Sequence, residues 1–545
     1  MKTKFIYMYR SRCPYVVKAH RGSAVHLAHP PRAALRESPA MPRTKSAALL
    51  IANVVVLFSS IIQLATSHSL SSTVAVVAAA GHRAEDPPTS ATSATSEAPR
   101  RPDLAIRIYL AELPPEYDMK RMWELAGRHG WFHWPTNASP AQPFGRVVSD
   151  DGRLWTTNQF AAELIVYHNL LRWPLRVRDI SQADLVYVPT FLGATVPKDP
   201  ALFGGDAALA EQVAQLGERF AANLSSILPY LQRLPHLVVL HYEKSFRGPD
   251  AVLGSPLAPY ISALVTEVAA DLPHDASLTL PGVPPLRGGP PPVGFYGNAI
   301  SIPYPAFVHH HRGCDACFHQ DVAAVAQRKN LTVFSVFNSR RHFGPGPWAI
   351  RDALIEQCRA RPGRCHQLTH NQASNREEVL DLAEAMERSW FCLQPHGDTP
   401  TRKSVYDGLM VTCIPVVFDQ VVLDSFPFRE VYDPSKIVVL APRAGIENGT
   451  SNIVDYLEAN YPLERRLQMV AEILRVRHIY QWSQHPDPRA ASWDTLHTFT
   501  RRDDALTMAI KRAVHGSCVR GFPGRFCGAV RAGQPIRAGT DAARA

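Results

Sequence analysis

Two hydrophobic patterns alternate along the chain after residue 103. Apolar runs of strand length occupy residues 104–113 (LAIRIYLAEL), 183–191 (ADLVYVPTF) and 236–243 (HLVVLHYE). Between them, residues 158–171 and about 208–233 space their apolar side chains as in an amphipathic helix. Strands that alternate with helices predict a parallel sheet with helices on its faces.

The same alternation resumes after residue 330 and predicts a second sheet. A strand is expected at residues 331–337, followed by helices at 348–358 and 376–389 and a strand at 390–393. A further strand at 437–440 precedes a long helical region. Residues 272–305 contain LPGVPPLRGGPPP and predict an insertion or surface loop between the two sets. We therefore predict two α/β domains joined near residues 308–333, with ligands bound in a cleft at the carboxyl ends of strands.

The first hundred residues have a different character. Residues 1–45 are basic, residues 46–66 form an apolar run just long enough to span a bilayer, and residues 67–103 are rich in Ala, Ser, Thr and Pro. This order predicts a cytosolic tail, an uncleaved signal anchor and a disordered stem, with everything beyond the anchor on the luminal side. A transit peptide of a plastid-imported soluble enzyme is the alternative, and Met41 is a possible second start.

Composition and charge narrow the class of protein. The chain of 545 residues is 46% hydrophobic and 19% charged, which is typical of a folded globular protein. Its net charge of +10 comes from the basic head and from a basic tail at residues 516–545, so the body between them is slightly acidic. A nucleic-acid partner is therefore not expected.

Cysteines and sequons agree with a luminal location. Eight of the nine cysteines follow the predicted anchor, and the close pairs Cys358/Cys365 and Cys518/Cys527 are the natural disulfide candidates. Cys392 and Cys413 lie in apolar runs and are expected to be buried thiols. The segment His309 to His319 could suggest zinc through Cys314 and Cys317, but a disulfide or a packed loop is favoured. Four glycosylation candidates also follow the anchor: Asn137, Asn223, Asn330 and Asn448.

Two loops carry candidate chemistry. In residues 391–418 (FCLQPHGDTPTRKSVYDGLMVTCIPVVF), a strand leads to a polar turn and then to a helix predicted to have Thr399 as N-cap and Pro400 as its first residue. The amides of the first helical turn, with Arg402 and Lys403, would make an anion site of diphosphate size. The alternative is a capped surface helix with an ion pair between Lys403 and Asp407.

The second loop, NSRRHFGPGP at residues 338–347, also joins a strand to a helix. It carries Arg340 and Arg341, and arginine binds phosphate oxygens in a bidentate manner. Two such loops in one domain suggest that their cations converge on one dianion. The alternative is that Arg340 and Arg341 face solvent.

The stretch at 391–418 resembles the signature of the exostosin-like glycosyltransferases of family 47, in particular the plant and algal branch with the xyloglucan galactosyltransferases. The likeness extends through NQFAAELIVYHNLLRWPLRVRDISQADLVYVPTF, IPYPAFVH, FSVFNSRR and IRDALIEQC, and covers residues 104–515 in order. It implies a GT-B fold of two Rossmann-like domains, with an acceptor-side lobe at about 104–310 and a nucleotide-sugar lobe at about 330–515. It also implies a single-pass type II Golgi membrane enzyme that transfers a sugar from a nucleotide diphosphate sugar to a glycan with inversion.

The resemblance assigns roles to residues of the two loops. Arg340 or Arg341 and Arg402 would hold the diphosphate with Ser404 beside it, and Asp407 would accept hydrogen bonds from the ribose. The Cys358/Cys365 pair also resembles a recurrent feature of this branch. The sequence departs from the family pattern at His396, where Pro is more familiar, and in the Pro/Gly-rich segment 281–292.

Two further requirements concern charge and proton transfer. No D-x-D triplet occurs in the chain, so we predict a reaction without a metal or other cofactor, in which cations neutralise the leaving diphosphate. Inversion also needs a base near the acceptor hydroxyl, and Glu163 and Glu243 are the candidates, although either could be structural. Expected partners are the donor, a glycan acceptor and the Golgi membrane, with possible oligomers. The alternative function is a membrane-anchored glycan-binding protein that has lost catalysis.

Overall fold

The computed structural model divides the chain into two units, Met1–Ser90 and Ala91–Ala545, and the described residues all belong to the second. They are residues 104–113, 115, 142–189, 215, 219, 222, 236–239, 261–266, 299–309, 320–339, 349–368, 375–397, 400–519, 521–522 and 524–534. The predicted tail, anchor and stem lie outside them. Within these ranges no helix combines the length and the apolar character needed to cross a membrane.

The first sheet has six parallel strands in the order β2-β1-β3-β4-β5-β6. Its strands are β1 (Ile108–Leu110), β2 (Arg176–Val177), β3 (Leu185–Pro189), β4 (His236–Val239), β5 (Ser262–Val265) and β6 (Ala299–Ser301). All five residues of β3 are buried, as expected for a parallel strand covered on both faces. The sequence predicted the positions of β1, β3 and β4, and the parallel pairing is confirmed.

Helix α3 (Ala162–Leu171) follows β1 and packs against it. It begins four residues later than the predicted start at Asn158. The reason is local, because the Asn158 side chain accepts a hydrogen bond from the amide of Phe160 and holds a turn in place of a helical one. Of the helix predicted at about 208–233, only residues 215, 219 and 222 are described, and these are helical.

The second sheet has five parallel strands in the order β11-β10-β9-β7-β8. They are β7 (Leu331–Val336), β8 (Cys365–Leu368), β9 (Ser389–Leu393), β10 (Ile414–Val417) and β11 (Val439–Leu440). In both sheets the second strand in sequence lies on one side of the first and the remaining strands on the other. This order makes a topological switch point between β1 and β3 in one sheet and between β7 and β9 in the other, where ligands of such sheets bind.

Helices connect the strands of the second sheet, and three of them, α8, α10 and α14, begin with a side-chain cap that is readable in the sequence. Asn375, for example, accepts a hydrogen bond from the amide of Glu378 at the start of α10. Four α-helices connect or precede these strands, namely α8 (Val322–Arg328), α9 (Ile350–Arg359), α10 (Arg376–Glu387) and α11 (Lys403–Met410). Four more follow β10 and β11, namely α12 (Gln420–Asp424), α13 (Arg443–Glu447), α14 (Ile453–Asn460) and α15 (Leu463–Val476). The short 3-10 turns are Ile180–Gln182, Pro434–Lys436, Arg477–Tyr480 and Trp493–Thr495.

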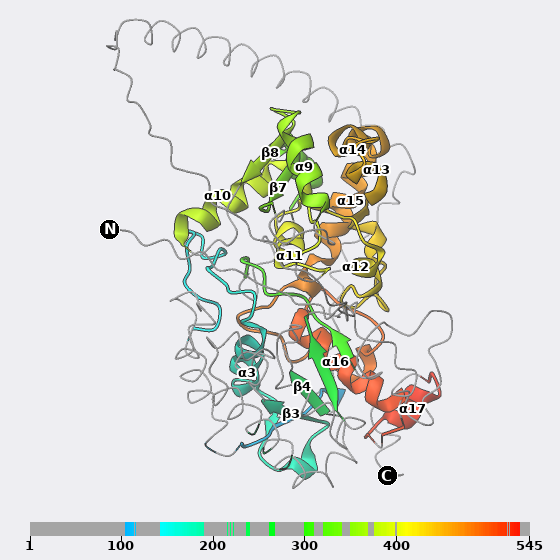
Figure 1. Cartoon of the computed structure of the whole chain (residues 1–545). Helices are drawn as coiled ribbons and strands as arrows, with labels where there is room; N and C mark the ends of the chain where they lie inside the picture. Colours follow the sequence, from blue (N-terminus) through cyan, green and yellow to red (C-terminus); the bar gives the residue numbers. More distant parts are fainter. Residues whose placement is uncertain are drawn as a thin grey trace, which may run out of the picture. The chain divides into compact units, whose positions relative to one another are not determined.

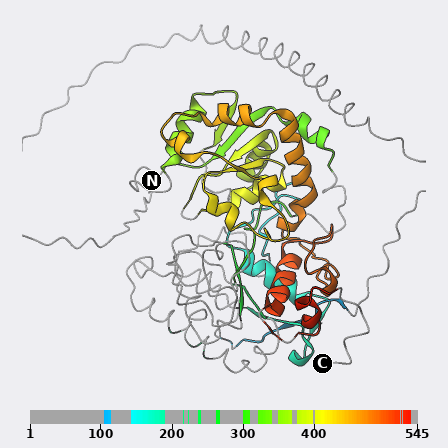
Figure 2. The same cartoon turned by 90° about the vertical axis from the view of Figure 1, so that its right-hand side faces the viewer.

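The C-terminal helices return to the first sheet. Helix α16 (Ala505–Val519) contacts β4, β5 and β6, and α17 (Cys527–Arg531) packs on α16. Figures 1 and 2 show these two red helices beside the first sheet, away from the orange helices that precede them in the sequence. The amide of Ile106 donates to the carbonyl of Ala491 at 3.1 Å, so the returning chain also borders the start of β1. The sequence predicted a helical region here but not which sheet it covers.

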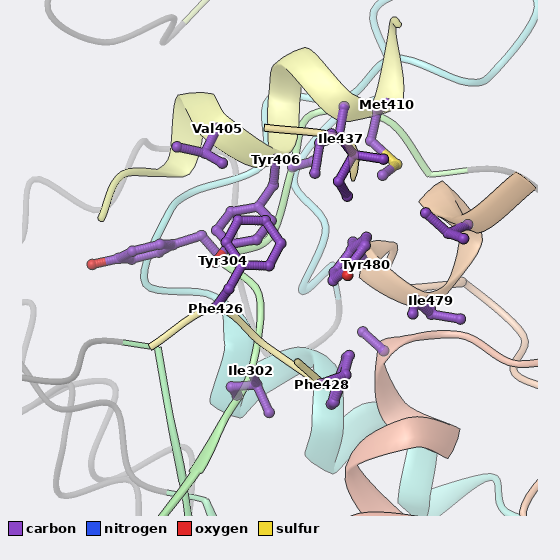
Figure 3. Close-up of a cluster of buried hydrophobic side chains, with 14 of the residues drawn as sticks. Ile302, Tyr304, Val405, Tyr406, Met410, Phe426, Phe428, Ile437, Ile479 and Tyr480 are labelled. Carbon is purple, nitrogen blue, oxygen red and sulfur yellow. The ribbon is translucent and has the colours of Figure 1, made fainter. Parts of the chain in front are cut away.

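A continuous apolar cluster connects the segment after β6 with helix α11 (Figure 3). The ring of Tyr406 on α11 lies 6.4 Å from the ring of Tyr304 and 6.0 Å from that of Phe426, measured between centroids. Phe426 in turn meets Tyr480 edge to face at 5.4 Å. Because these rings are buried on all sides, the cluster holds α11 in place against the residues that follow the first sheet.

Three disulfides lie in the described part of the chain. Cys358–Cys365 joins α9 to β8 and Cys518–Cys527 joins α16 to α17, which confirms both predicted pairs. The third, Cys392–Cys413, shows that the prediction of two buried thiols was wrong. Cys392 lies in β9, and Cys413 directly precedes the neighbouring strand β10. The pairing of the two strands therefore brings the Cα atoms of the two cysteines to 5.7 Å, which is within disulfide range.

Candidate anion-binding site

Two loops leave the second sheet at its switch point, one after β7 and one after β9. The loop after β9 leads to α11, which begins at Lys403 with Arg402 as its N-cap. The predicted start, with Thr399 as cap and Pro400 as first helical residue, was therefore wrong. Proline constrains only its own φ, and here the contacts of Arg402 and Ser404 with the ends of β7 and β9 decide where the helix starts.

Gln394, the first residue after β9, anchors the first turn of α11. Its side-chain amide donates to the carbonyl of Ser404 at 3.1 Å, and the Ser404 hydroxyl donates back to the Gln394 side-chain oxygen. The backbone amide of Gln394 also donates to the carbonyl of Val416 in β10, at 2.8 Å. Ser404, a predicted site residue, is thus buried and held at the end of β9. Sequence reasoning missed Gln394, because a glutamine after a strand gives no signal of its own.

Arg402 reaches across to the neighbouring strand. Its Nη2 donates to the carbonyl of Val336, the last residue of β7, at 3.5 Å. The guanidinium therefore lies between the ends of β7 and β9, beside the start of the loop that carries Arg340 and Arg341. Those two arginines lie outside the described residues.

Arg351, in the first turn of α9, is a second arginine at this point that the sequence did not single out. It is buried, with Nε donating to the carbonyl of His396 at 2.8 Å and Nη1 donating to that of Asn338 at 3.5 Å. Its guanidinium carbon lies 5.8 Å from the centroid of the Phe337 ring. A signal was available, because Arg351 falls at helical spacing on the apolar face with Leu354, Ile355 and Cys358.

Asp407 lies one turn into α11 and is almost completely buried, with 2% of its surface exposed. Lys403 Nζ lies 2.7 and 2.9 Å from its two oxygens, and the amide of Phe307 donates to Oδ1 at 2.9 Å. Burial raises the pKa of Asp407, against the lowering effects of Lys403 and the Phe307 amide. The ion pair predicted as the alternative is present, but it is a buried link to the segment after β6. The ribose contact of Asp407 stays a prediction.

The carboxyl ends of β10 and β11 add an ion pair to the same edge. Arg443 donates to Asp419 at 2.7 Å and to Glu447 at 2.9 Å. These charges also influence the pKa of His396. Burial lowers this pKa the most, and the Gly397 carbonyl and Asp419 oppose the lowering. The positive charges of Arg443 and Arg351 lower the pKa further. This lowering of the pKa favours the neutral form of the imidazole.

The other predicted residues lie elsewhere or outside the described ranges. Glu163 lies in the first turn of α3, and 1% of its surface is exposed. The pKa of Tyr187 in β3 is raised, mainly by burial and secondly by the negative charge of Glu163. Both ring nitrogens of His309 hydrogen-bond within the protein, to Trp482 and Thr157. Asn330 and Asn448 are exposed. Outside the described residues are Glu243, Cys314, Cys317, Asn137 and Asn223.

The fold and this edge define an α/β protein in which arginines and a helix N-terminus meet at the switch point of a parallel sheet. Residues 102–457 match the family model described as the Exostosin GT47 domain. This match covers more than half of the chain, and the protein therefore belongs to the exostosin family GT47.

Curated relatives from Arabidopsis thaliana agree with this assignment. Xyloglucan-specific galacturonosyltransferase 1 is 29% identical over 321 residues, which are 57% of this chain and 43% of the relative. Xyloglucan galactosyltransferase MUR3 is 26% identical over 57% of this chain and 48% of its own length. Probable xyloglucan galactosyltransferase GT13 is 26% identical over 61% and 66%, respectively. The chain thus spans between about two fifths and two thirds of the length of these relatives.

Proposed function

We propose that this protein is a glycosyltransferase that moves a sugar from a nucleotide diphosphate sugar to a cell-wall or extracellular glycan, with inversion at the anomeric carbon. The observation that carries the proposal is the meeting of Arg402, Arg351 and the start of α11 at the switch point between β7 and β9. The names of the relatives support a glycan acceptor, since they describe transfer to xyloglucan.

The proposed donor site neutralises the charge of the leaving diphosphate. Arg402 and the first amides of α11 supply positive charge from one loop, and Arg340 and Arg341 would supply it from the other. Because the charge develops on the diphosphate as the glycosidic bond to the donor breaks, cations already held in place lower the barrier without reorganisation. We propose that these side chains replace a metal ion, as the lack of a D-x-D triplet suggested.

The acceptor side of the proposal uses the first sheet. Together the two sheets would form the two Rossmann-like domains of a GT-B enzyme, with the acceptor between them. Glu163 follows β1 in the first turn of α3, at the carboxyl edge of the first sheet, and remains a candidate base together with Glu243. Its burial means that acceptor binding would have to open a path to it before it could take a proton.

We also propose a Golgi location, with residues 46–66 as a type II signal anchor. The three disulfides among the described residues support a catalytic region in an oxidising compartment. Protease treatment of intact vesicles should spare the C-terminal region, whereas degradation of that region would contradict this orientation.

Donor screening with the full-length protein tests the proposed activity. Xyloglucan would be offered with UDP-galactose, UDP-galacturonate, UDP-xylose, UDP-arabinose and UDP-glucuronate, and release of nucleotide diphosphate would be measured with and without acceptor. We expect one donor to give acceptor-dependent release that persists in excess EDTA. Glycan binding without release from any donor would favour the non-catalytic alternative, and loss of activity in EDTA would contradict the metal-free reaction.

A further inference from the structure

Arg351 occupies a position that opposes helix stability. It is the second residue of α9, next to the positive end of the helix, where a cation is disfavoured. It is also buried, with 3% of its surface exposed, and burying a guanidinium has an additional cost in solvation. Arg351 lies on the same face of α9 as Leu354 and Ile355, where an apolar residue would pack well. The contacts that Arg351 makes must therefore account for it.

Those contacts join the two loops of the switch point. Nε donates to His396 in the loop after β9, and Nη1 donates to Asn338 in the loop after β7. Strands β7 and β9 are direct neighbours, so the guanidinium fork spans the gap where their loops separate. One side chain thus hydrogen-bonds to both loops.

The positive charge of Arg351 also acts on His396, in the loop after β9. Together with Arg443 it lowers the pKa of His396, after the larger effect of burial. Asn338 is two residues before Arg340, so Arg351 holds the described start of the loop that carries Arg340. On the other side, His396 lies in the turn that leads to Arg402.

We infer that Arg351 is a positioning residue that clamps the two loops of the donor site at the separation a diphosphate requires. This inference rests on the proposed function and deepens it. Arg351 acts through the loops, by presenting their cations together, and a preformed arrangement spares the ligand the cost of ordering them. A lysine at this position keeps the charge but lacks the planar fork that reaches both carbonyls.

The test compares Arg351→Met and Arg351→Lys with the wild-type full-length protein. Arg359→Met is the matched control, since Arg359 is an exposed arginine in the last turn of the same helix. Calorimetry would measure the affinity for UDP, GDP and the corresponding monophosphates, and thermal unfolding would be followed in parallel. We expect Arg351→Met to weaken diphosphate binding at least tenfold and monophosphate binding less than threefold, with Arg351→Lys between it and the wild type. Arg359→Met should stay within twofold of the wild type.

Each other outcome has a distinct meaning. A wild-type protein that binds neither diphosphate overturns the proposed function and this inference with it. A wild type that binds, with Arg351→Met at equal affinity or with diphosphate and monophosphate weakened alike, overturns the inference alone. If Arg351→Met does not fold, Arg351→Lys decides, because unchanged diphosphate affinity in a folded lysine variant shows that the fork does not position the loops.

Discussion

The two sheets share one strand order but place their charges at opposite ends. In the first sheet, Asp184 precedes β3 and accepts hydrogen bonds from Arg107 at 3.1 Å and from Arg525 at 3.1 Å, so this cluster lies at the amino end. In the second sheet, Arg351 and Arg402 lie at the carboxyl end, where Arg351 donates to the loop after β9 and Arg402 to the last residue of β7. Topology makes a ligand position in both sheets, and the placement of cations singles out the second for an anion.

The described contacts also differ in kind. In the first sheet, Arg107 and Arg525 share the buried carboxylate of Asp184, and Arg525 also donates to the carbonyl of Ala105 ahead of β1, which ties this end of the sheet to the C-terminal segment. In the second sheet, Arg351 and Arg402 donate to backbone carbonyls near the carboxyl ends of β7 and β9, where we propose that the diphosphate binds. Substitutions should therefore affect stability at the first cluster and ligand binding at the second.

The largest effect is expected from Asp184→Asn. The variant removes the negative charge between Arg107 and Arg525, and the loss of a buried partner should reduce the free energy of unfolding by about 3 kcal/mol. Denaturant unfolding measures this, and donor affinity of the folded variant should not change. A large loss of donor affinity would contradict the division between the two clusters.

Arg402→Ala should give the next largest effect, on binding rather than on stability. Loss of a charge-assisted bond to the diphosphate corresponds to about 2 to 3 kcal/mol, or roughly 30- to 160-fold in donor affinity. Titration with the donor measures it. Arg388→Ala is the control, since Arg388 is an exposed arginine just before β9, at the amino end of the same sheet. Equal affinity in the wild type and Arg402→Ala would remove the diphosphate role.

Acid should destabilise the protein through His309. Burial lowers the pKa of His309 from 6.5 to about 3, so the unfolded chain binds the proton more readily. Stability is then complete above pH 6.5 and is lost as the pH falls from there toward 3, by about 2 kcal/mol at pH 5 for this group. Unfolding curves of the wild type and His309→Gln between pH 8 and 5 isolate the contribution. Parallel pH dependences would show that another group titrates.

Asp407→Asn should have the smallest effect, and it tests the contact between α11 and the segment after β6. An asparagine keeps the acceptor for the Phe307 amide but loses the ion pair with Lys403. We expect this to cost only about 1 kcal/mol of stability, because burial already disfavours the charged form of Asp407 and the Lys403 side chain stays partly exposed. Affinities for UDP and 2′-deoxy-UDP separate the two possible roles of Asp407. A ribose contact predicts that the variant no longer distinguishes them, whereas unchanged discrimination assigns Asp407 to the junction alone.

Much of the site was readable in residues 391–418 because its pieces are local. A strand, a polar turn and a helix with adjacent cations are consecutive in the chain, and β9 and α11 form there. The start of α11 was misplaced because distant groups decide it: Arg402 contacts β7, and Gln394 is held by β10. Cys392 and Cys413 were misjudged for the same reason, since strand pairing brings them together.

The sequence alone determined the alternation of strands and helices, the family, two of the three disulfides described and the loop that carries Arg402. These features follow from periodicity, short spacing and contiguous motifs, which do not depend on remote contacts. Only the tertiary structure decided that Arg351 bridges the two loops, that Asp407 is buried against Phe307, and that α16 covers the first sheet. Each of these depends on residues tens to hundreds of positions apart, and only packing of the whole chain sets their distance.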